Sequence, residues 1–186
     1  VLTGLQTAFS EKRPDMIMVQ GDTTTAFVAA LAGFYAGIQV AHVEAGLRTW
    51  NRFAPYPEEV NRQMVSCLAD FHFAPTAQAQ KNLERQGIPA DRIWVTGNTV
   101  IDALDIMVKQ VRRAAPVFPP DFPVDSLADG RRMILITGHR RENFGSGFES
   151  ICRAIALLAG RYPEYAFIYP VHLNPSVQRP VREILS

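Results

Sequence analysis

Short apolar runs that alternate with stretches of helical periodicity are the feature that most constrains the fold of this chain. Each run has the length of a strand and is apolar on both faces; the runs fall at 15–20, 38–43, 70–74 and 93–96. Helical periodicity fills the intervals, over 23–35, 58–68, 76–86 and 100–111. Such strands, separated by helices, are typical of a parallel sheet covered on both sides. The sequence therefore predicts the α/β class, with doubly wound, Rossmann-like sheets.

The alternation is interrupted between residues 115 and 130, a proline-rich stretch in which we expect a linker or a surface crossing. It then resumes, with apolar runs at 133–136 and 166–171 and helical patterns at 148–162 and from 176. We expect an N-terminal Rossmann-like domain over 1–98, and over 99–186 the linker and the start of a C-terminal nucleotide-binding domain. Because the chain starts and stops in mid-pattern, we expect an internal fragment in which both domains are incomplete.

Charge and cysteine content narrow the classes of function. The formal net charge is +1, with both signs scattered along the chain, so no basic patch predicts binding to nucleic acid or to a membrane surface. No apolar run approaches the length of a transmembrane helix. Cys67 and Cys152 fall in apolar helical patterns and form neither a metal-binding nor a redox spacing. We expect two buried thiols, no bound metal and a cytoplasmic, reducing location.

The stretch ILITGHRRENFG, residues 134–145, has the composition of a phosphate-binding turn. Ionisable side chains follow its apolar run: His139, Arg140, Arg141 and Glu142. Glycines at 145 and 147 then precede a helical pattern that starts near Phe148. Backbone N–H groups at a helix start and arginine side chains are donors that bind phosphate. The alternative explanation is a solvated basic turn that only connects a strand to a helix.

Carboxylates and imidazoles follow several of the predicted strands. In open α/β sheets, ligands bind just outside the carboxyl ends of the strands, where the following residues are expected: Asp22, His42, Glu44, His139 and His172. Glu58 and Glu59 open a helix after a loop long enough to fold back over that edge. Ordinary explanations are a helix cap for Asp22, a helix dipole for the glutamates and a hydrogen-bonded core position for His42. Together these residues predict an active-site crevice with acid–base groups facing an anion site.

Seven strings, in order along the chain, carry a resemblance to a known family: QGDTTTAFVAALAG, AHVEAGLRT, PEEVNR, FAPT, VTGNTVIDAL, TGHRRENFG and PVHLNP. They look like the non-hydrolysing UDP-N-acetylglucosamine 2-epimerases of bacteria, whereas the hydrolysing epimerases differ in the first three strings. The resemblance implies two Rossmann-like domains arranged as in two-domain glycosyltransferases, with the nucleotide sugar between them. It also implies a homodimer without a cofactor that interconverts UDP-GlcNAc and UDP-ManNAc for cell-surface polysaccharide.

The resemblance implies roles for individual residues. The matched catalytic residues are Asp22, Glu44, Glu58 and His139. The matched substrate-binding residues are Arg140, Arg141, Glu142, Asn143 and His172. A second, allosteric UDP-GlcNAc site of bacterial members is matched by Arg140, His172 and Glu58.

The chemistry explains why such groups are needed. Carbon 2 of the sugar becomes acidic only when the bond from C1 to the diphosphate breaks, because C1 is then cation-like. A carboxylate removes the C2 proton to leave a 2-acetamidoglucal and UDP, and protonation from the opposite face as UDP returns inverts C2. We expect the carboxylates to exchange this proton, and His139 with nearby arginines to stabilise the diphosphate. The alternatives are a hydrolysing epimerase, a glycosyltransferase with the same cleft, and a non-catalytic nucleotide-sugar sensor.

Overall fold

The computed structural model describes residues 1–114, 116–118, 130–138 and 143–185, and the chain divides into two compact units, Val1–Ala115 and Pro116–Ser186. Parallel strands and helices make up both units, so the α/β class predicted from the sequence is confirmed. The division falls after the helix α5 (Thr99–Arg113), which belongs to the first unit. The sequence-based boundary between 98 and 99 stays a prediction.

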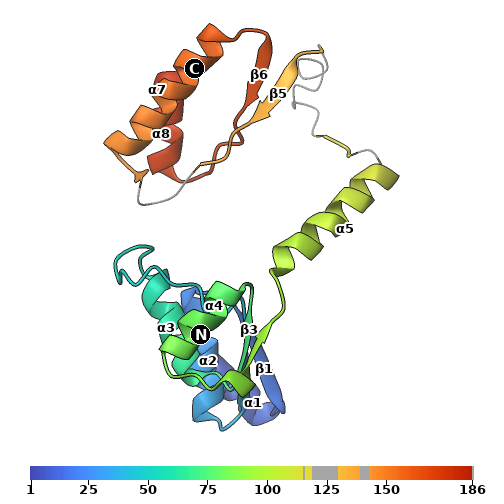
Figure 1. Cartoon of the computed structure of the whole chain (residues 1–186), viewed down its shortest axis with the longest axis vertical. Coiled ribbons are helices and arrows are strands. Elements are labelled where there is room, and N and C mark those ends of the chain that lie inside the picture. The colour runs from blue at the N-terminus through green and yellow to red at the C-terminus, as the bar shows by residue number, and fades with distance from the viewer. Residues whose placement is uncertain (115, 119–129, 139–142, 186) are drawn as a thin grey trace. The chain divides into compact units, whose positions relative to one another are not determined.

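Four parallel strands form the sheet of the first unit, in the order β1-β2-β3-β4. Figure 1 shows the elements of this unit, which are α1 (Leu2–Glu11), β1 (Met16–Gln20), α2 (Thr24–Tyr35), β2 (Gln39–Val43), α3 (Glu58–Leu68), β3 (Phe71–Ala74), α4 (Ala77–Arg85), the 3-10 helix η1 (Ala90–Arg92), β4 (Ile93–Val95) and α5. The register pairs Gln20 with Val43, so the carboxyl ends of β1 and β2 lie side by side. His42 pairs with Val19 on one side and with His72 on the other, and the three residues therefore share one face.

Helices α2, α3 and α4 pack on the face of the sheet that carries Val19, Val40 and Ile93. Val40 is fully buried there, and burial of one such side chain stabilises the fold by about 1.5–3 kcal/mol. The other face carries Met18 and Trp94, which remain exposed. Within the described residues, helices therefore cover one face of the sheet, whereas the two-sided apolarity of its strands predicts cover on both.

The helices that border the strand ends begin in two different ways. Thr23 caps α2, because its hydroxyl oxygen accepts the N–H of Ala26 at 3.2 Å, and α4 has the same arrangement at Thr76. Helix α3 has no capping side chain, and its first turn carries Glu58 and Glu59 instead. Carboxylates in a first turn favour the helix, because they complement the positive end of its dipole.

The second unit pairs β5 (Arg132–Leu135) with β6 (Tyr165–Ile168) in parallel, and adds helices α7 (Ser146–Arg161) and α8 (Pro175–Leu185). Its core contains Phe148, Cys152 and Val177. Burial of Cys152 confirms one of the two thiol predictions, but Cys67 is exposed. The prediction for Cys67 is wrong because α3 packs through residues such as Val65, and position 67 faces away from that contact.

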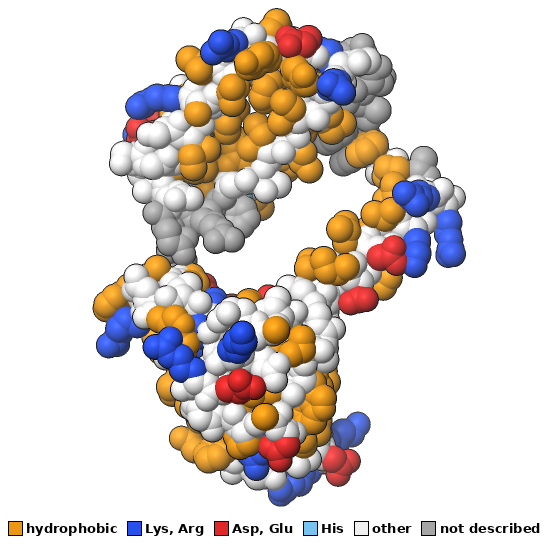
Figure 2. All heavy atoms as spheres, in the orientation of Figure 1, with side chains coloured by type: hydrophobic (Ala, Val, Ile, Leu, Met, Phe, Trp, Pro, Cys, Tyr) orange, Lys and Arg blue, Asp and Glu red, His pale blue; other side chains and the backbone are white. Residues whose placement is uncertain are grey.

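Apolar side chains stay exposed in both units. No residue of α5 is buried, and hydrophobic side chains such as Val100, Leu104 and Met107 lie along its surface (Figure 2). In the second unit, Figure 2 shows many hydrophobic side chains on the surface. This unit also has a cavity of about 460 Å³, lined by Ile155, Phe167 and other residues. No helix in the described parts of the chain is long and apolar enough to cross a membrane.

Candidate functional site

Asp22 lies two residues after the end of β1, where two side chains of α3 hold it. Its carboxylate forms an ion pair with Arg62 of α3, with Nη2 and Oδ2 2.6 Å apart. Its backbone carbonyl accepts the side-chain amide of Asn61 at 2.9 Å. Because Thr23 caps α2, Asp22 does not serve as the helix cap. The side chain remains 28% exposed, so it is fixed by α3 and still accessible from solvent.

Glu44 follows β2 and lies next to the Asp22 turn. It has a positive φ of 65°, which is uncommon for a residue with a side chain. A Cβ built on Gly21 would be 3.8 Å from the Glu44 carboxylate, so this carboxylate lies over the residue that precedes Asp22. The structure therefore brings Asp22 and Glu44 together at neighbouring strand ends, as the sequence predicts.

Glu58 lies at the start of helix α3, which packs beside the ends of β1 and β2. It is half-buried in the first turn of α3. Residues four apart lie on the same face of a helix, so Glu58 and Arg62 are neighbours on the surface of α3. Since Arg62 contacts Asp22, α3 presents Glu58 on the same side as the strand-end carboxylates.

The loop from 44 to 57, between β2 and α3, is fastened by buried polar side chains. Glu59 is fully buried, and its carboxylate accepts the backbone N–H groups of Thr49 and Trp50. Arg48 donates to the Gln86 side chain and to the Ser66 hydroxyl. Burial lowers the pKa of Arg48 to about 10, which leaves the guanidinium charged at neutral pH. The path of this loop is therefore set by charged groups that face inward.

His42 is buried beneath the Asp22 turn and has a structural role. Its Nε2 lies 2.9 Å from the carbonyl oxygen of Gly21, so Nε2 carries the proton of the neutral ring and donates it to this bond. Burial lowers the pKa of His42 to about 4, and burial also lowers that of its strand neighbour His72 to about 4. Both rings are neutral at physiological pH, and the interpretation of His42 as a hydrogen-bonded core histidine is confirmed.

The second unit has predicted site residues of its own, at the end of β5 and the start of α7. The predicted residues His139, Arg140, Arg141 and Glu142 lie outside the described residues. Asn143 lines a cavity of about 440 Å³ together with Thr137, Gly138, Phe148 and Tyr169. The Tyr169 hydroxyl donates a hydrogen bond to the Gly138 carbonyl, directly before the predicted anion-binding turn.

His172 lies in the segment between β6 and α8 and is exposed. Its Nδ1 accepts the backbone N–H of Asn174 at 3.0 Å. The side chain of Asn174 in turn accepts the N–H of Ser176 at the start of α8. The imidazole thus helps to shape this turn, and its predicted contacts with a ligand remain predictions.

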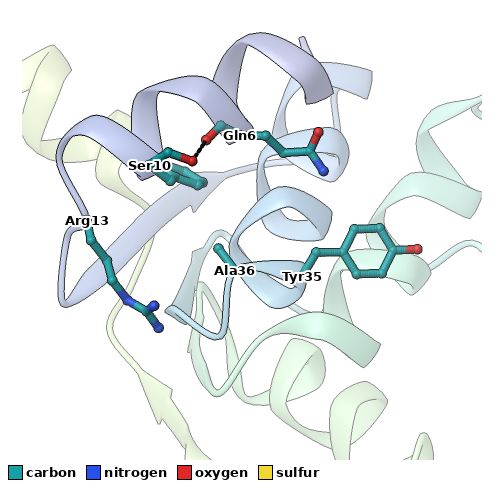
Figure 3. Close-up of a pocket in the computed structure, with 6 residues that line it drawn as sticks. Gln6, Ser10, Arg13, Tyr35 and Ala36 are labelled. Carbon is teal, nitrogen blue, oxygen red and sulfur yellow. Dashed lines mark hydrogen bonds between the residues drawn. The ribbon is translucent and has the colours of Figure 1, made fainter.

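A further pocket of the first unit lies between α1 and α2. Figure 3 shows Gln6, Ser10, Arg13 and Tyr35 at its wall, and its volume is about 460 Å³. Both helices end there before the strands that follow them begin, so the pocket lies at the amino-end edge of the sheet. Arg13 is already occupied, because it donates to the Gly37 carbonyl at 3.1 Å. None of the predicted site residues lines this pocket.

Sequence reasoning missed the groups that hold the carboxylates in place. Arg62 and Asn61 both contact Asp22 but were not named from the sequence. Glu59 was named at the helix that folds back over the strand ends, with the helix dipole as its alternative, but not as a buried partner of the loop. The signal for Arg62 was its position four residues after Glu58, which puts both on one face of the helix. No signal in the sequence shows that Glu59 faces inward.

The fold and its strand ends define a Rossmann-like α/β protein in which carboxylates gather at the carboxyl edge of a parallel sheet. The family model for UDP-N-acetylglucosamine 2-epimerase matches residues 1–186. This chain belongs to the UDP-N-acetylglucosamine 2-epimerase family.

Its similarity to individual proteins covers the whole chain but only part of each relative. It is 50% identical to the UDP-N-acetylglucosamine 2-epimerase of Yersinia pestis, over 100% of this chain and 50% of that protein. The crystal structure of the Neisseria meningitidis UDP-GlcNAc 2-epimerase bound to UDP-GlcNAc is 42% identical, with a TM-score of 0.88, and covers 99% of this chain and 50% of that one. The Methanocaldococcus jannaschii enzyme in complex with UDP-GlcNAc and UDP is 31% identical, with a TM-score of 0.74, over 99% and 49% of the two chains. This chain therefore spans about half the length of the relatives it matches.

Proposed function

We propose that this chain supplies the proton-transfer carboxylates of a non-hydrolysing UDP-N-acetylglucosamine 2-epimerase, which interconverts UDP-GlcNAc and UDP-ManNAc. The observation that carries the proposal is the pair of carboxylates, Asp22 and Glu44, at the neighbouring ends of β1 and β2, in a chain that matches this family over residues 1–186. Such a pair suits a reaction in which a proton leaves a carbon from one face and returns to the other.

The proposed reaction begins with cleavage of the C1–oxygen bond, whose electron pair leaves with UDP. One carboxylate takes the C2 proton, and the C2–H electrons form the C1–C2 double bond of a 2-acetamidoglucal. A second carboxyl group, which is protonated at this stage, then gives its proton to C2 from the opposite face; the double-bond electrons form the new C2–H bond while a UDP oxygen adds to C1. We assign these proton transfers to Asp22, Glu44 and Glu58. We assign the diphosphate to His139, with Arg140, Arg141, Glu142, Asn143 and His172 as further substrate-binding residues.

The proposal extends to assembly, location and regulation. We propose a cytoplasmic homodimer that makes UDP-ManNAc for cell-surface polysaccharide and requires neither a metal nor a redox cofactor. A second UDP-GlcNAc, bound by Arg140, His172 and Glu58, would activate conversion of UDP-ManNAc if it binds the closed state more tightly than the open one. In the full-length protein, Arg140→Ala and His172→Ala should weaken this activation while UDP-GlcNAc still binds the catalytic site. Unaltered activation in both variants contradicts the regulatory part alone.

The products of the full-length protein test the activity itself. Incubation with UDP-GlcNAc, followed by anion-exchange separation and proton NMR, should show UDP-ManNAc at equilibrium with UDP-GlcNAc. Accumulation of free ManNAc and UDP would instead identify a hydrolysing epimerase. Transfer of GlcNAc to an added acceptor without any UDP-ManNAc would identify a glycosyltransferase.

A further inference from the structure

Glu59 is a buried carboxylate at the centre of the fastened loop, although the proposed reaction does not use it. Its side chain is fully buried. The Thr49 N–H donates to Oε2 at 3.0 Å and the Trp50 N–H donates to Oε1 at 3.1 Å. The Gln63 amide donates to Oε1 at 2.8 Å, and Arg62 Nη1 lies 3.6 Å from Oε2. Both oxygens are therefore satisfied from the loop on one side and from α3 on the other.

These partners keep the Glu59 carboxylate ionised. Burial acts to raise its pKa, because a charge is less stable away from water. Hydrogen bonds from Thr49, Gln63 and Trp50, together with the charge of Arg62, more than offset burial and lower the pKa of Glu59 below its ordinary value. A permanent negative charge thus lies beneath the loop at neutral pH.

The loop needs such an anchor because its backbone is strained. Glu44 at its start has φ 65° and Trp50 has φ 61°, and both lie in the left-handed region that residues with side chains rarely adopt. Residues in this region persist where surrounding contacts hold them. Glu59 bonds directly to the N–H of Trp50, so it holds one of the two strained positions.

Arg62 connects this anchor to the candidate site. One nitrogen of its guanidinium, Nη1, faces Glu59, and the other, Nη2, forms the 2.6 Å ion pair with Asp22. The guanidinium is planar and only 11% of its side chain is exposed, so contact with Glu59 restricts the orientation from which it meets Asp22. Glu59, Arg62 and Asp22 form one continuous charge chain from the loop to the strand end.

We propose that Glu59 is a positioning residue for the epimerase reaction, acting through Arg62 on Asp22 and through the 44–57 loop on Glu44. It does not touch the substrate; it fixes the placement of two carboxylates that do. This inference rests on the proposed function, because it assumes that Asp22 and Glu44 exchange the C2 proton.

The test is Glu59→Gln in the full-length protein, assayed well below its melting temperature. Gln keeps the shape, but it removes the charge that faces Arg62 and directs an NH₂ group toward a backbone N–H. We expect kcat to fall about tenfold to a hundredfold, the effect of misplacing a catalytic group by about 1 Å, with KM changed less than about threefold. Glu84→Gln is the matched control, because Glu84 also accepts from a glutamine one turn away, Gln80, but is exposed on α4. It should leave kcat unchanged.

A double-mutant cycle separates positioning from a purely structural role. Because Glu59 acts in part through Asp22, Glu59→Gln should lower the kcat of Asp22→Asn by a clearly smaller factor than it lowers the kcat of the wild type. Independent, multiplying losses of kcat overturn the inference, and so does a lowered melting temperature with wild-type kcat in Glu59→Gln.

Glu59→Asp is a second variant, which keeps the charge but shortens the side chain. An intermediate kcat in Glu59→Asp supports the inference even if Glu59→Gln does not fold, and wild-type kcat in Glu59→Asp counts against it. Full activity in Asp22→Asn would overturn the proposed role of Asp22 in proton transfer, whereas an inactive Asp22→Asn with a fully active Glu59→Gln overturns only this inference.

Discussion

The two units hold polar groups at their strand ends in different ways. In the first unit, Arg62 of α3 fixes Asp22, and the backbone of the 44–57 loop together with Arg62 fixes Glu59. In the second unit, the described residues at the end of β5 line a cavity, and Tyr169 supplies a hydrogen bond to the backbone there. The difference matches the two tasks of the proposed reaction, which are proton transfer and diphosphate binding. Proton transfer needs carboxylates in fixed positions, whereas binding a diphosphate needs donors around a space.

The largest expected effect comes from the groups assigned to catalysis. Asp22→Asn, Glu44→Gln, Glu58→Gln and His139→Asn in the full-length protein should each lower the rate of epimerisation by at least about a hundredfold. The melting temperature should change little, because the replacements are nearly isosteric. Asp105→Asn is the control, since Asp105 is an exposed carboxylate of α5 paired with Lys109. If Asp22→Asn or Glu44→Gln keeps full activity, that residue has no role in proton transfer.

The strands, the helices and the strand-end position of Asp22 and Glu44 were predictable from the sequence, because they follow from local sequence patterns. Apolar periodicity located the strands and helices, and the strand-end rule placed Asp22 beside Glu44. The inward orientation of Glu59 was not predictable, because it depends on the path of a loop that has positive φ values at Glu44, Gly46 and Trp50. Arg62 was missed for a related reason: its partners come from the end of β1 and from α3, and only the folded chain brings them together.

A side chain at Gly46 should disrupt the packing of α4 against the 44–57 loop of the first unit. Gly46 has φ 89°, and a Cβ built there would lie 2.8 Å from the backbone carbonyl carbon of Ala79 in α4 and overlap its oxygen. Gly46→Ala should therefore destabilise the protein by about 3 kcal/mol or more, since backbone has to move. Gly87→Ala is the matched control, because Gly87 has φ 85° with open space around it. It should cost only the left-handed strain, about 1–2 kcal/mol. Equal losses of melting temperature in the two variants contradict this packing.

The buried histidines of the first unit should make its stability depend on pH. The pKa of His42 and of His72 is about 4 in the folded protein, against an ordinary value of 6.5 for the exposed side chain. The unfolded chain therefore binds more protons between these values, so stability is complete above about pH 6.5 and falls as the pH drops toward 4. The loss should approach about 3 kcal/mol for each ring. Thermal unfolding at pH 7 and pH 5 measures it, and His72→Leu should reduce the difference. Equal melting temperatures at both pH values contradict the buried, neutral state.

The smallest expected effect belongs to the second unit. Tyr169→Phe removes the hydrogen bond to the Gly138 carbonyl and leaves the ring in place. The melting temperature should fall by the equivalent of about 1 kcal/mol, the usual contribution of one hydrogen bond. Tyr165→Phe is the control, since the ring of Tyr165 contacts Tyr162 but its hydroxyl makes no hydrogen bond among the described residues. A loss of several kcal/mol would show that this strand end is as tightly fixed as that of the first unit.

In the proposed reaction, the strand-end carboxylates of the first unit exchange the proton on carbon 2 of the sugar. Proton NMR of UDP-GlcNAc in deuterated buffer measures this exchange directly. With the full-length protein, deuterium should enter C2 of both UDP-GlcNAc and UDP-ManNAc, and with Glu44→Gln it should enter at least about a hundredfold more slowly. Epimerisation without deuterium at C2, or exchange at the wild-type rate in both Glu44→Gln and Asp22→Asn, would contradict this role of the carboxylates.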